Sequence, residues 1–153
     1  MQISEIYLEF KNAGDLIRLE PIDLNYPTAT EDWDRSWVKT KISVKAGVFS
    51  GHFNANCMTM DFELFKQRLK ILDNDFNAIA TFEPLENCLS LKISGDGLGH
   101  FELHCEVSPN PPEGEKLSFV IDFDQTEIKN YIRQLDKITK AFPIKGDFKI
   151  QNE

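Results

Sequence analysis

With 153 residues, 41% apolar and 27% charged, the chain has the length and balance of one globular domain, and we expect a single domain over residues 1–153. The net charge of −8 argues against nucleic acid and anionic membranes as direct partners, because both would repel the chain at long range. The N-terminus carries no basic region followed by an apolar run, and no stretch could span a bilayer. We therefore expect a cytoplasmic protein.

The first third of the chain predicts four strands. Residues 6–10 and 17–19 alternate around a turn at residues 12–15, which is typical of a strand pair. Residues 20–35 lose this periodicity, contain two prolines and several acidic residues, and predict a long surface connection. Residues 38–44 and 49–57 alternate again on either side of a turn, which predicts a hairpin.

The middle of the chain predicts a helix followed by a meander. Apolar residues recur at helical spacing from Phe62 to Leu72, and Thr59 or Asp61 can cap the start of this helix. Three alternating runs follow at residues 78–82, 89–93 and 101–107. A glycine-rich stretch at residues 95–99 lies between two of these strands and opens no helix, so we interpret it as a turn rather than a phosphate-binding loop.

The last predicted strand, residues 117–123, runs directly into a second helix. Asp124 and Glu127 have the spacing of a capping box, and Pro143 ends the helix. Its predicted core stripe consists of Ile128, Ile132, Leu135 and Phe142. The order ββββαββββα with short connections predicts an α+β fold, in which about eight strands form a curved antiparallel sheet or two packed sheets covered by two helices.

No motif in the sequence specifies catalysis. His100, Glu102, His104 and Glu106 share one side of a strand, and His52 is a candidate for a neighbouring polar face, but ligands about 7 Å apart along a strand do not converge on one ion. Asp122 and Asp124 look like an acid–base pair, yet a helix cap and a solvated strand position explain them. Cys57, Cys88 and Cys105 lack CxxC spacing and are interpreted as free buried thiols. We expect no catalytic residue, no metal and no cofactor.

Trp33 and Trp37 flank Asp34 and Arg35 at the end of the acidic connection. One interpretation is structural: Trp37 packs in the core and Trp33 covers the edge of a sheet. The other is a binding anchor, because aromatic residues beside a charged rim are typical of binding hot spots.

Several local strings resemble those of the WapI-type immunity proteins, which accompany secreted bacterial contact-dependent toxins. They are Asp-Trp-Asp-Arg-Ser-Trp at 32–37, Gly-Val-Phe-Ser-Gly at 47–51, the helix at 61–72, the strand and helix at 117–135, and Phe-Pro-Ile at 142–144. The resemblance implies a protein that binds and blocks the C-terminal toxin domain, often a nuclease. It implies no contact residues.

Three hypotheses follow. The first is an immunity protein that binds a cognate toxin domain through Glu31, Asp32, Trp33 and Asp34, without a cofactor. The second is a small-ligand or regulatory binding module, with a cavity lined by Phe49, Phe53, Phe101 and Phe119. The third is an enzyme or metalloprotein that uses His100, Glu102 and His104. The oligomeric state is not predicted.

Overall fold

A computed structural model describes residues 6–144, which form two four-stranded antiparallel sheets and a layer of helices. The first sheet has the order β1-β2-β3-β4, and the second has the order β5-β6-β7-β8. The predicted α+β class and its order of strands and long helices are therefore confirmed. The elements are β1 Leu8–Asn12, β2 Asp15–Leu24, α1 Asp32–Arg35, β3 Trp37–Ala46, β4 Phe49–Met58, α2 Thr59–Asn74, β5 Ala80–Phe82, β6 Leu89–Gly95, β7 His100–Val107, β8 Leu117–Asp124, a 3₁₀ turn at Gln125–Glu127, and α3 Ile128–Ala141.

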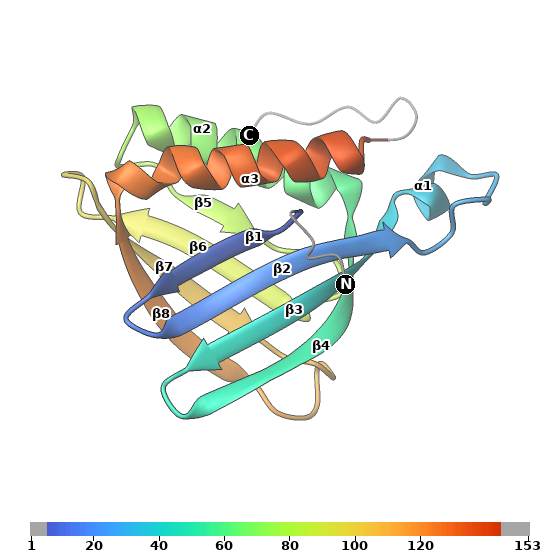
Figure 1. Cartoon of the computed structure of the whole chain (residues 1–153), viewed down its shortest axis with the longest axis horizontal. Helices are drawn as coiled ribbons and strands as arrows, with labels where there is room; N and C mark the ends of the chain where they lie inside the picture. The colour runs from blue at the N-terminus through green and yellow to red at the C-terminus, as the bar shows by residue number, and fades with distance from the viewer. Residues whose placement is uncertain (1–5, 145–153) are drawn as a thin grey trace.

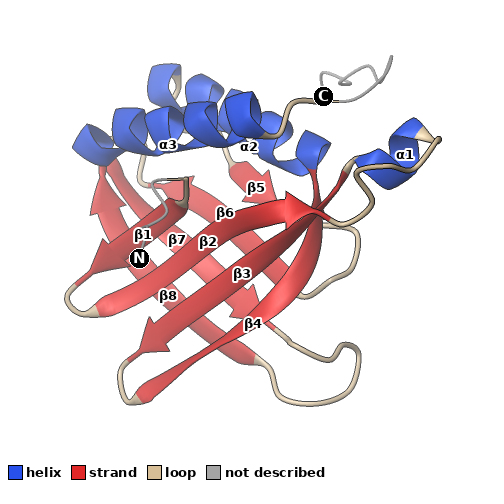
Figure 2. Cartoon of the chain, turned by 45° about the vertical axis from the view of Figure 1, so that its right-hand side comes forward, coloured by secondary structure: helices blue, strands red, loops and turns tan. Residues whose placement is uncertain are grey.

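The two sheets face each other with their strands crossed, and α2 and α3 lie side by side across one end of both sheets (Figures 1 and 2). Most strands alternate between buried and more exposed residues, as expected when one face of a sheet meets the core and the other meets solvent, whereas the first half of β4 has no buried residue. Edge strands β1 and β8 approach each other, and Asn12 Nδ2 donates a hydrogen bond of 3.0 Å to the Asp122 carbonyl. The sheets are therefore joined along one side and covered by helices at one end.

Aromatic rings connect the sheets to the helices. Phe10 on β1 lies 4.1 Å from the ring of Tyr131 on α3, 6.0 Å from Phe123 on β8 and 6.4 Å from Phe65 on α2, measured between ring centroids. Phe10 and Phe65 are fully buried, and Tyr131 nearly so. One side chain thus contacts both sheets and both long helices.

The second strand is longer than its sequence pattern predicts. The surface connection was expected to begin at Glu20, but β2 continues to Leu24, with a bulge between Pro21 and Asp23. β1 begins at Leu8, opposite Leu19, so the part of β2 after Leu19 has β3 as its only strand neighbour within the described chain. A proline is tolerated beside such a free edge and a bulge, because its missing N–H removes no bond that the neighbour needs. The connection itself spans residues 25–36.

The predicted helix starts are confirmed in part. Asp61 caps α2 by accepting a hydrogen bond of 2.7 Å from the Met58 backbone N–H, whereas Thr59 is the first helical residue and its hydroxyl has no hydrogen-bond partner within residues 6–144. The choice of Thr59 as a cap is therefore wrong. Asp124 accepts a bond of 2.9 Å from the Thr126 N–H as a cap should, but a 3₁₀ turn separates it from α3.

The buried stripe of α3 differs from the predicted one at half of its positions. Ile128 and Leu135 are buried as expected, while Ile132 and Phe142 are only partly buried. Tyr131 and Ile138 complete the buried face instead. Tyr131 was not part of the predicted stripe, although its ring supplies as much apolar area as that of a phenylalanine.

We expect Phe10→Ala to lower the free energy of unfolding by about 3–5 kcal/mol, because the lost ring would leave a cavity between both sheets and both helices. Leu98→Ala, at a side chain that is 83% exposed, is the control and should change stability by less than about 0.5 kcal/mol. Urea denaturation followed by circular dichroism measures both. A loss near 1 kcal/mol for Phe10→Ala would contradict the central role of this ring.

Candidate functional site

The predicted partner-binding residues lie on a loop that projects from the body of the protein. We call residues 25–36 the acidic loop; it connects β2 to β3 and contains α1 (Figure 1). The Asn25 N–H donates a hydrogen bond of 3.0 Å to the Trp37 carbonyl, and the Thr59 N–H donates one of 2.9 Å to the Ser36 carbonyl. The Asn25 side chain also donates a bond of 2.6 Å to the Asn56 side chain. The loop is therefore fixed at its base, with its middle held away from the sheets.

The three predicted acidic residues of the loop are not equivalent. Asp32 forms an ion pair with Arg35 one helical turn later, and the Ser36 hydroxyl donates a hydrogen bond of 2.7 Å to the Asp32 carbonyl. Within residues 6–144, Glu31 and Asp34 form no ion pair. The uncompensated charge of the acidic loop therefore lies on Glu31 and Asp34, while Asp32 helps to hold the turn together.

Trp33 and Trp37 form one aromatic unit in which Trp37 supports Trp33. Their ring centroids are 6.0 Å apart with an interplanar angle of 85°, an edge-to-face arrangement. Trp37 is partly buried at the start of β3, whereas Trp33 is 48% exposed. The structural interpretation of Trp37 as a packing residue agrees with this geometry, and about half of the Trp33 ring remains available to a partner.

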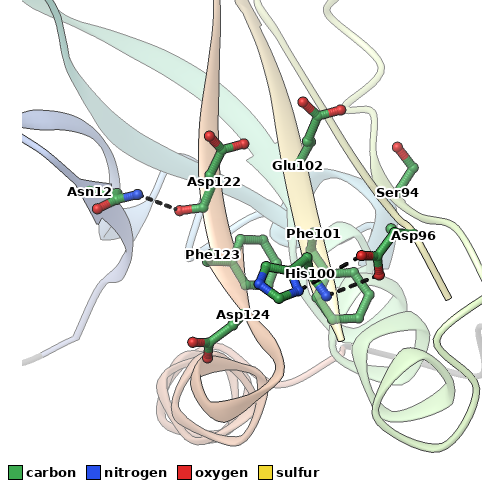
Figure 3. Close-up of a pocket in the computed structure, with 10 residues that line it drawn as sticks. Asn12, Ser94, Asp96, His100, Phe101, Glu102, Asp122, Phe123 and Asp124 are labelled. Carbon is green, nitrogen blue, oxygen red and sulfur yellow. Dashed lines mark hydrogen bonds and ion pairs between the residues drawn. The ribbon is translucent and has the colours of Figure 1, made fainter. Parts of the chain in front are cut away.

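A second acidic region lies on the outer face of the second sheet. Glu102 is opposite Asp122 in the pairing of β7 with β8, and His100 is opposite Asp124. With Asp96, these residues line an open pocket of about 570 Å³, and Figure 3 shows the Glu102 and Asp122 side chains pointing the same way from neighbouring strands. Sequence spacing placed these residues in two separate candidate sites, and strand pairing brings them together.

The hydrogen bonds around this pocket favour ionised carboxylates. The backbone N–H groups of Leu98 and His100 donate to Asp96 Oδ1 at 2.7 and 3.2 Å, and they lower the pKa of Asp96. Hydrogen bonds from the Thr126 hydroxyl and N–H likewise lower the pKa of Asp124. A general acid needs the opposite shift, so these two carboxylates are suited to turn and cap geometry rather than to proton transfer.

The candidate histidines of the sequence do not come together in the structure. His100 Nδ1 lies 3.7 Å from Asp96 and His104 Nε2 lies 3.6 Å from Glu102, so each faces its own carboxylate. His52 was considered a neighbour, but it lies on β4 in the other sheet, opposite Ser43. Among residues 6–144, no group of three or more His, Cys, Asp or Glu side chains is arranged to hold a metal ion.

The four phenylalanines of the ligand-binding hypothesis do not line one cavity. Phe101 is buried against Phe123, with ring centroids 5.4 Å apart, at the end of the second sheet. Phe49 lies at the tip of the β3–β4 hairpin and is 63% exposed. Phe53 and Phe119 are partly buried against the core. The predicted cavity is therefore wrong, because it assumed that one alternating face is buried along its whole length.

The three cysteines are free, as expected. Burial raises the pKa of both Cys57 and Cys105, and it brings that of Cys105 to about 12. Both side chains therefore remain unreactive thiols. Cys88 is partly buried, and burial also raises its pKa.

Among the carboxylates with a resolved pKa shift, Asp61 has the most unusual environment. It lies in the first turn of α2, beside the thiol of Cys57 on β4. Burial raises its pKa from 3.8 to about 6, although the bond from the Met58 N–H and the charge of Arg68 both oppose this shift. The sequence signalled Asp61 only as a helix cap. Its burial follows from the way β4 runs directly into α2.

These features describe a two-sheet α+β protein with a projecting acidic loop. None of the helices in the described part has the length and apolar character needed to cross a lipid bilayer. The chain matches the model of the Immunity protein WapI-like family over residues 8–143. It therefore belongs to the WapI-like immunity protein family, and this membership suggests toxin neutralisation by binding; such families are generally non-enzymatic.

The fold also occurs in solved structures with little sequence similarity. The chain is 13% identical to trypanosome MRP1/MRP2, with a TM-score of 0.50 and coverage of 88% of this chain and 83% of that one. It is 12% identical to the plant transcriptional regulator PBF-2, with a TM-score of 0.51 and coverage of 92% and 84%. At these identities the similarity shows the fold alone. No curated protein sequence matches this chain.

We expect Asp61→Asn to stabilise the protein at pH 7.5 by about 1–2 kcal/mol. The folded state binds the Asp61 proton more tightly than the unfolded state does, so stability falls as the pH rises from about 4 through about 6. An asparagine can still accept the bond from Met58 but carries no buried charge. At pH 4.5 most of the gain should vanish.

Urea denaturation at both pH values measures this effect. The matched control is Asp75→Asn, because Asp75 is exposed and also accepts a backbone bond, of 3.0 Å from the Asn77 N–H. An equal gain for Asp61→Asn at both pH values would contradict the proposed burial penalty.

Proposed function

We propose that this protein neutralises the C-terminal toxin domain of a secreted bacterial toxin, and that this domain is a nuclease. The acidic loop is the proposed contact, with Trp33 as its anchor and Glu31, Asp32 and Asp34 around it. The observation that carries the choice of surface is the half-exposed Trp33 ring, supported by Trp37 on a loop that is fixed at its base.

The charge of the protein supports a basic partner. The chain has a net charge of −8, and nuclease domains that bind nucleic acid present basic surfaces to it. Complementary potentials speed the encounter of two proteins and suppress wrong partners. Glu31 and Asp34 are suited to this role because, within the described chain, no cation compensates them.

The shape of the acidic loop supports inhibition by occlusion. The loop stands away from both sheets, and α1 buries none of its residues in its own protein (Figure 2). A projecting loop of this kind can enter a concave catalytic site and exclude substrate without a cofactor. The complete interface should bury on the order of 1,600 Å², so residues beyond the loop also take part.

The direct test is to look for a secreted toxin encoded beside this gene, to produce its C-terminal fragment, and to measure the nuclease activity of this fragment with and without this protein. We expect stoichiometric inhibition and protection of cells that express both. No binding would overturn the neutralisation proposal. Binding to a fragment that cleaves neither DNA nor RNA would overturn only its nuclease part.

We expect Trp33→Ala to weaken toxin binding by at least about 30-fold, which corresponds to about 2 kcal/mol, mainly through faster dissociation. Surface plasmon resonance with the purified toxin fragment measures both rates. Leu85→Ala is the matched control, because Leu85 is an exposed apolar side chain in the connection between β5 and β6. Equal affinity for wild type and Trp33→Ala would remove the acidic loop as the anchor.

We expect the double change Glu31→Gln and Asp34→Asn to slow association by about tenfold at low salt while leaving dissociation nearly unchanged. Raising the salt concentration should shrink this difference, because screening acts on the long-range attraction. The control is Glu113→Gln with Glu115→Gln, which removes the same charge from an exposed loop between β7 and β8. A larger effect from the control would place the steering charge elsewhere.

A further inference from the structure

The β4 strand leaves one edge of the first sheet unpaired. It stands at the end of the order β1-β2-β3-β4, and within residues 6–144 its only strand neighbour is β3. Its pairing with β3 is regular over ten residues, without a bulge. From Phe49 to Asn54 every residue is exposed except the half-buried Phe53, so nothing in the described chain covers this part of the edge.

The free β4 edge lacks the features by which proteins usually protect such strands. Natural edges carry charges, prolines or bulges, or they are short or covered. No Asp, Glu, Lys, Arg or Pro lies between Lys45 and Asp61, although 27% of the chain is charged. The hairpin tip adds exposed apolar surface, with Val48 92% and Phe49 63% exposed.

The other edge strands are protected. β1 carries Glu9 and Lys11 and contacts α3 and β8. β5 has only three residues, and β8 carries Asp122 and Asp124. The absence of protection is therefore specific to β4.

The hairpin geometry shows which β4 backbone groups are free. Ala46 and Phe49 are paired and flank a two-residue turn, and such a flanking pair exchanges its hydrogen bonds across the hairpin. Alternation along the strand then directs the N–H and C=O groups of Ser50, His52 and Asn54 away from β3. These groups can pair with a further strand.

We infer that the protein forms a dimer in which β4 pairs antiparallel with β4 of a second copy, joining the two first sheets into one. A twofold axis at Gly51 places Phe49 of each copy opposite Phe53 of the other. Phe49 and Phe53 share one face of the strand, and aromatic residues directly opposite each other stabilise antiparallel pairs. Gly51, which has open space around it, meets its own copy without a side chain.

The charge pattern permits a second copy at this edge, and the self-complementary arrangement of Phe49, Gly51 and Phe53 favours it over other occupants. Two molecules with a charge of −8 repel each other over most of their surface, and β4 is a long strand without acidic residues. The nearest charges are Lys41 and Lys45 on β3. Across the dimer the two β3 strands are about 14 Å apart, beyond the screening length of about 8 Å at physiological salt.

This dimer leaves the proposed toxin-binding surface open. The acidic loop begins where β2 ends, at the opposite end of the sheet from the β3–β4 hairpin tip (Figure 1). The inference is therefore independent of the toxin proposal, and its test uses no toxin.

Sedimentation velocity of the full-length protein from about 1 to 200 µM is the first measurement. We expect a shift from the 17.6 kDa monomer to a species of twice that mass, with a dissociation constant in the micromolar range. A monomer throughout this concentration range overturns the inference.

Two β4 variants test the interface. The double variant Ser50→Glu with His52→Glu places two carboxylates beside Lys41 and Lys45 of β3 in the same molecule, and these contacts support folding. In the dimer the new carboxylates of the two copies lie directly opposite each other and repel. We expect at least about tenfold weaker dimerisation. His52→Pro removes an outward N–H that β3 does not use, and it should weaken the dimer similarly.

The matched control is Thr28→Glu with Asn110→Glu, which adds the same charge at exposed loop positions away from β4 and should leave the dimer intact. Circular dichroism and the melting temperature confirm that each variant folds. A dimer that folded β4 variants do not weaken, or that the control weakens equally, overturns the assignment to β4. If the Glu variant unfolds, the folded His52→Pro variant decides in the same way.

Discussion

The contact between Phe10 and Tyr131 joins the first sheet to the helical layer, and much of the architecture depends on it. Phe10 also meets Phe123 of the second sheet and Phe65 of α2, so four elements share one aromatic centre. Two crossed sheets can cover each other only partly, and their apolar faces need a third layer where they diverge. The helices supply that layer at one end, and β4 extends to an end without such a cover.

The residues that stabilise the fold are largely distinct from the residues that are available for binding. The strings through which the sequence resembles its family include α2 and the passage from β8 into α3, and both are part of the core. The strings at 32–37 and 47–51 are exceptions. The first includes the exposed Trp33 as well as Arg35 and Ser36, which hold the turn, and the second includes the exposed Val48 and Phe49. Membership of the family therefore indicates a shared fold more directly than a shared binding partner.

Alternation and helical spacing were sufficient to predict the order of the eight strands and two long helices, because each face of each element is either in the core or in solvent. They failed where a local pattern has two structural outcomes. Pro21 looked like the end of a strand, but a bulge and a free edge accommodate it. Phe49 looked buried because it shares a face of β4 with the buried Ala55, yet the first half of β4 extends beyond the elements that cover the second half. The pocket formed by Glu102 and Asp122 depends on strand register, which single-strand periodicity does not contain.

Charge alone does not single out one surface for a basic partner. The outer face of the second sheet carries Glu102, Asp122 and Asp124, and together with the acidic loop it would attract a cationic domain. Exposed charges mainly govern the rate of encounter, whereas a desolvated aromatic anchor governs how long a complex lasts. Both acidic regions can therefore contribute to steering, but among their residues Trp33 alone combines a large apolar ring, partial exposure and a rigid support in Trp37. That combination, rather than the acidity, is the reason to place the anchor on the loop.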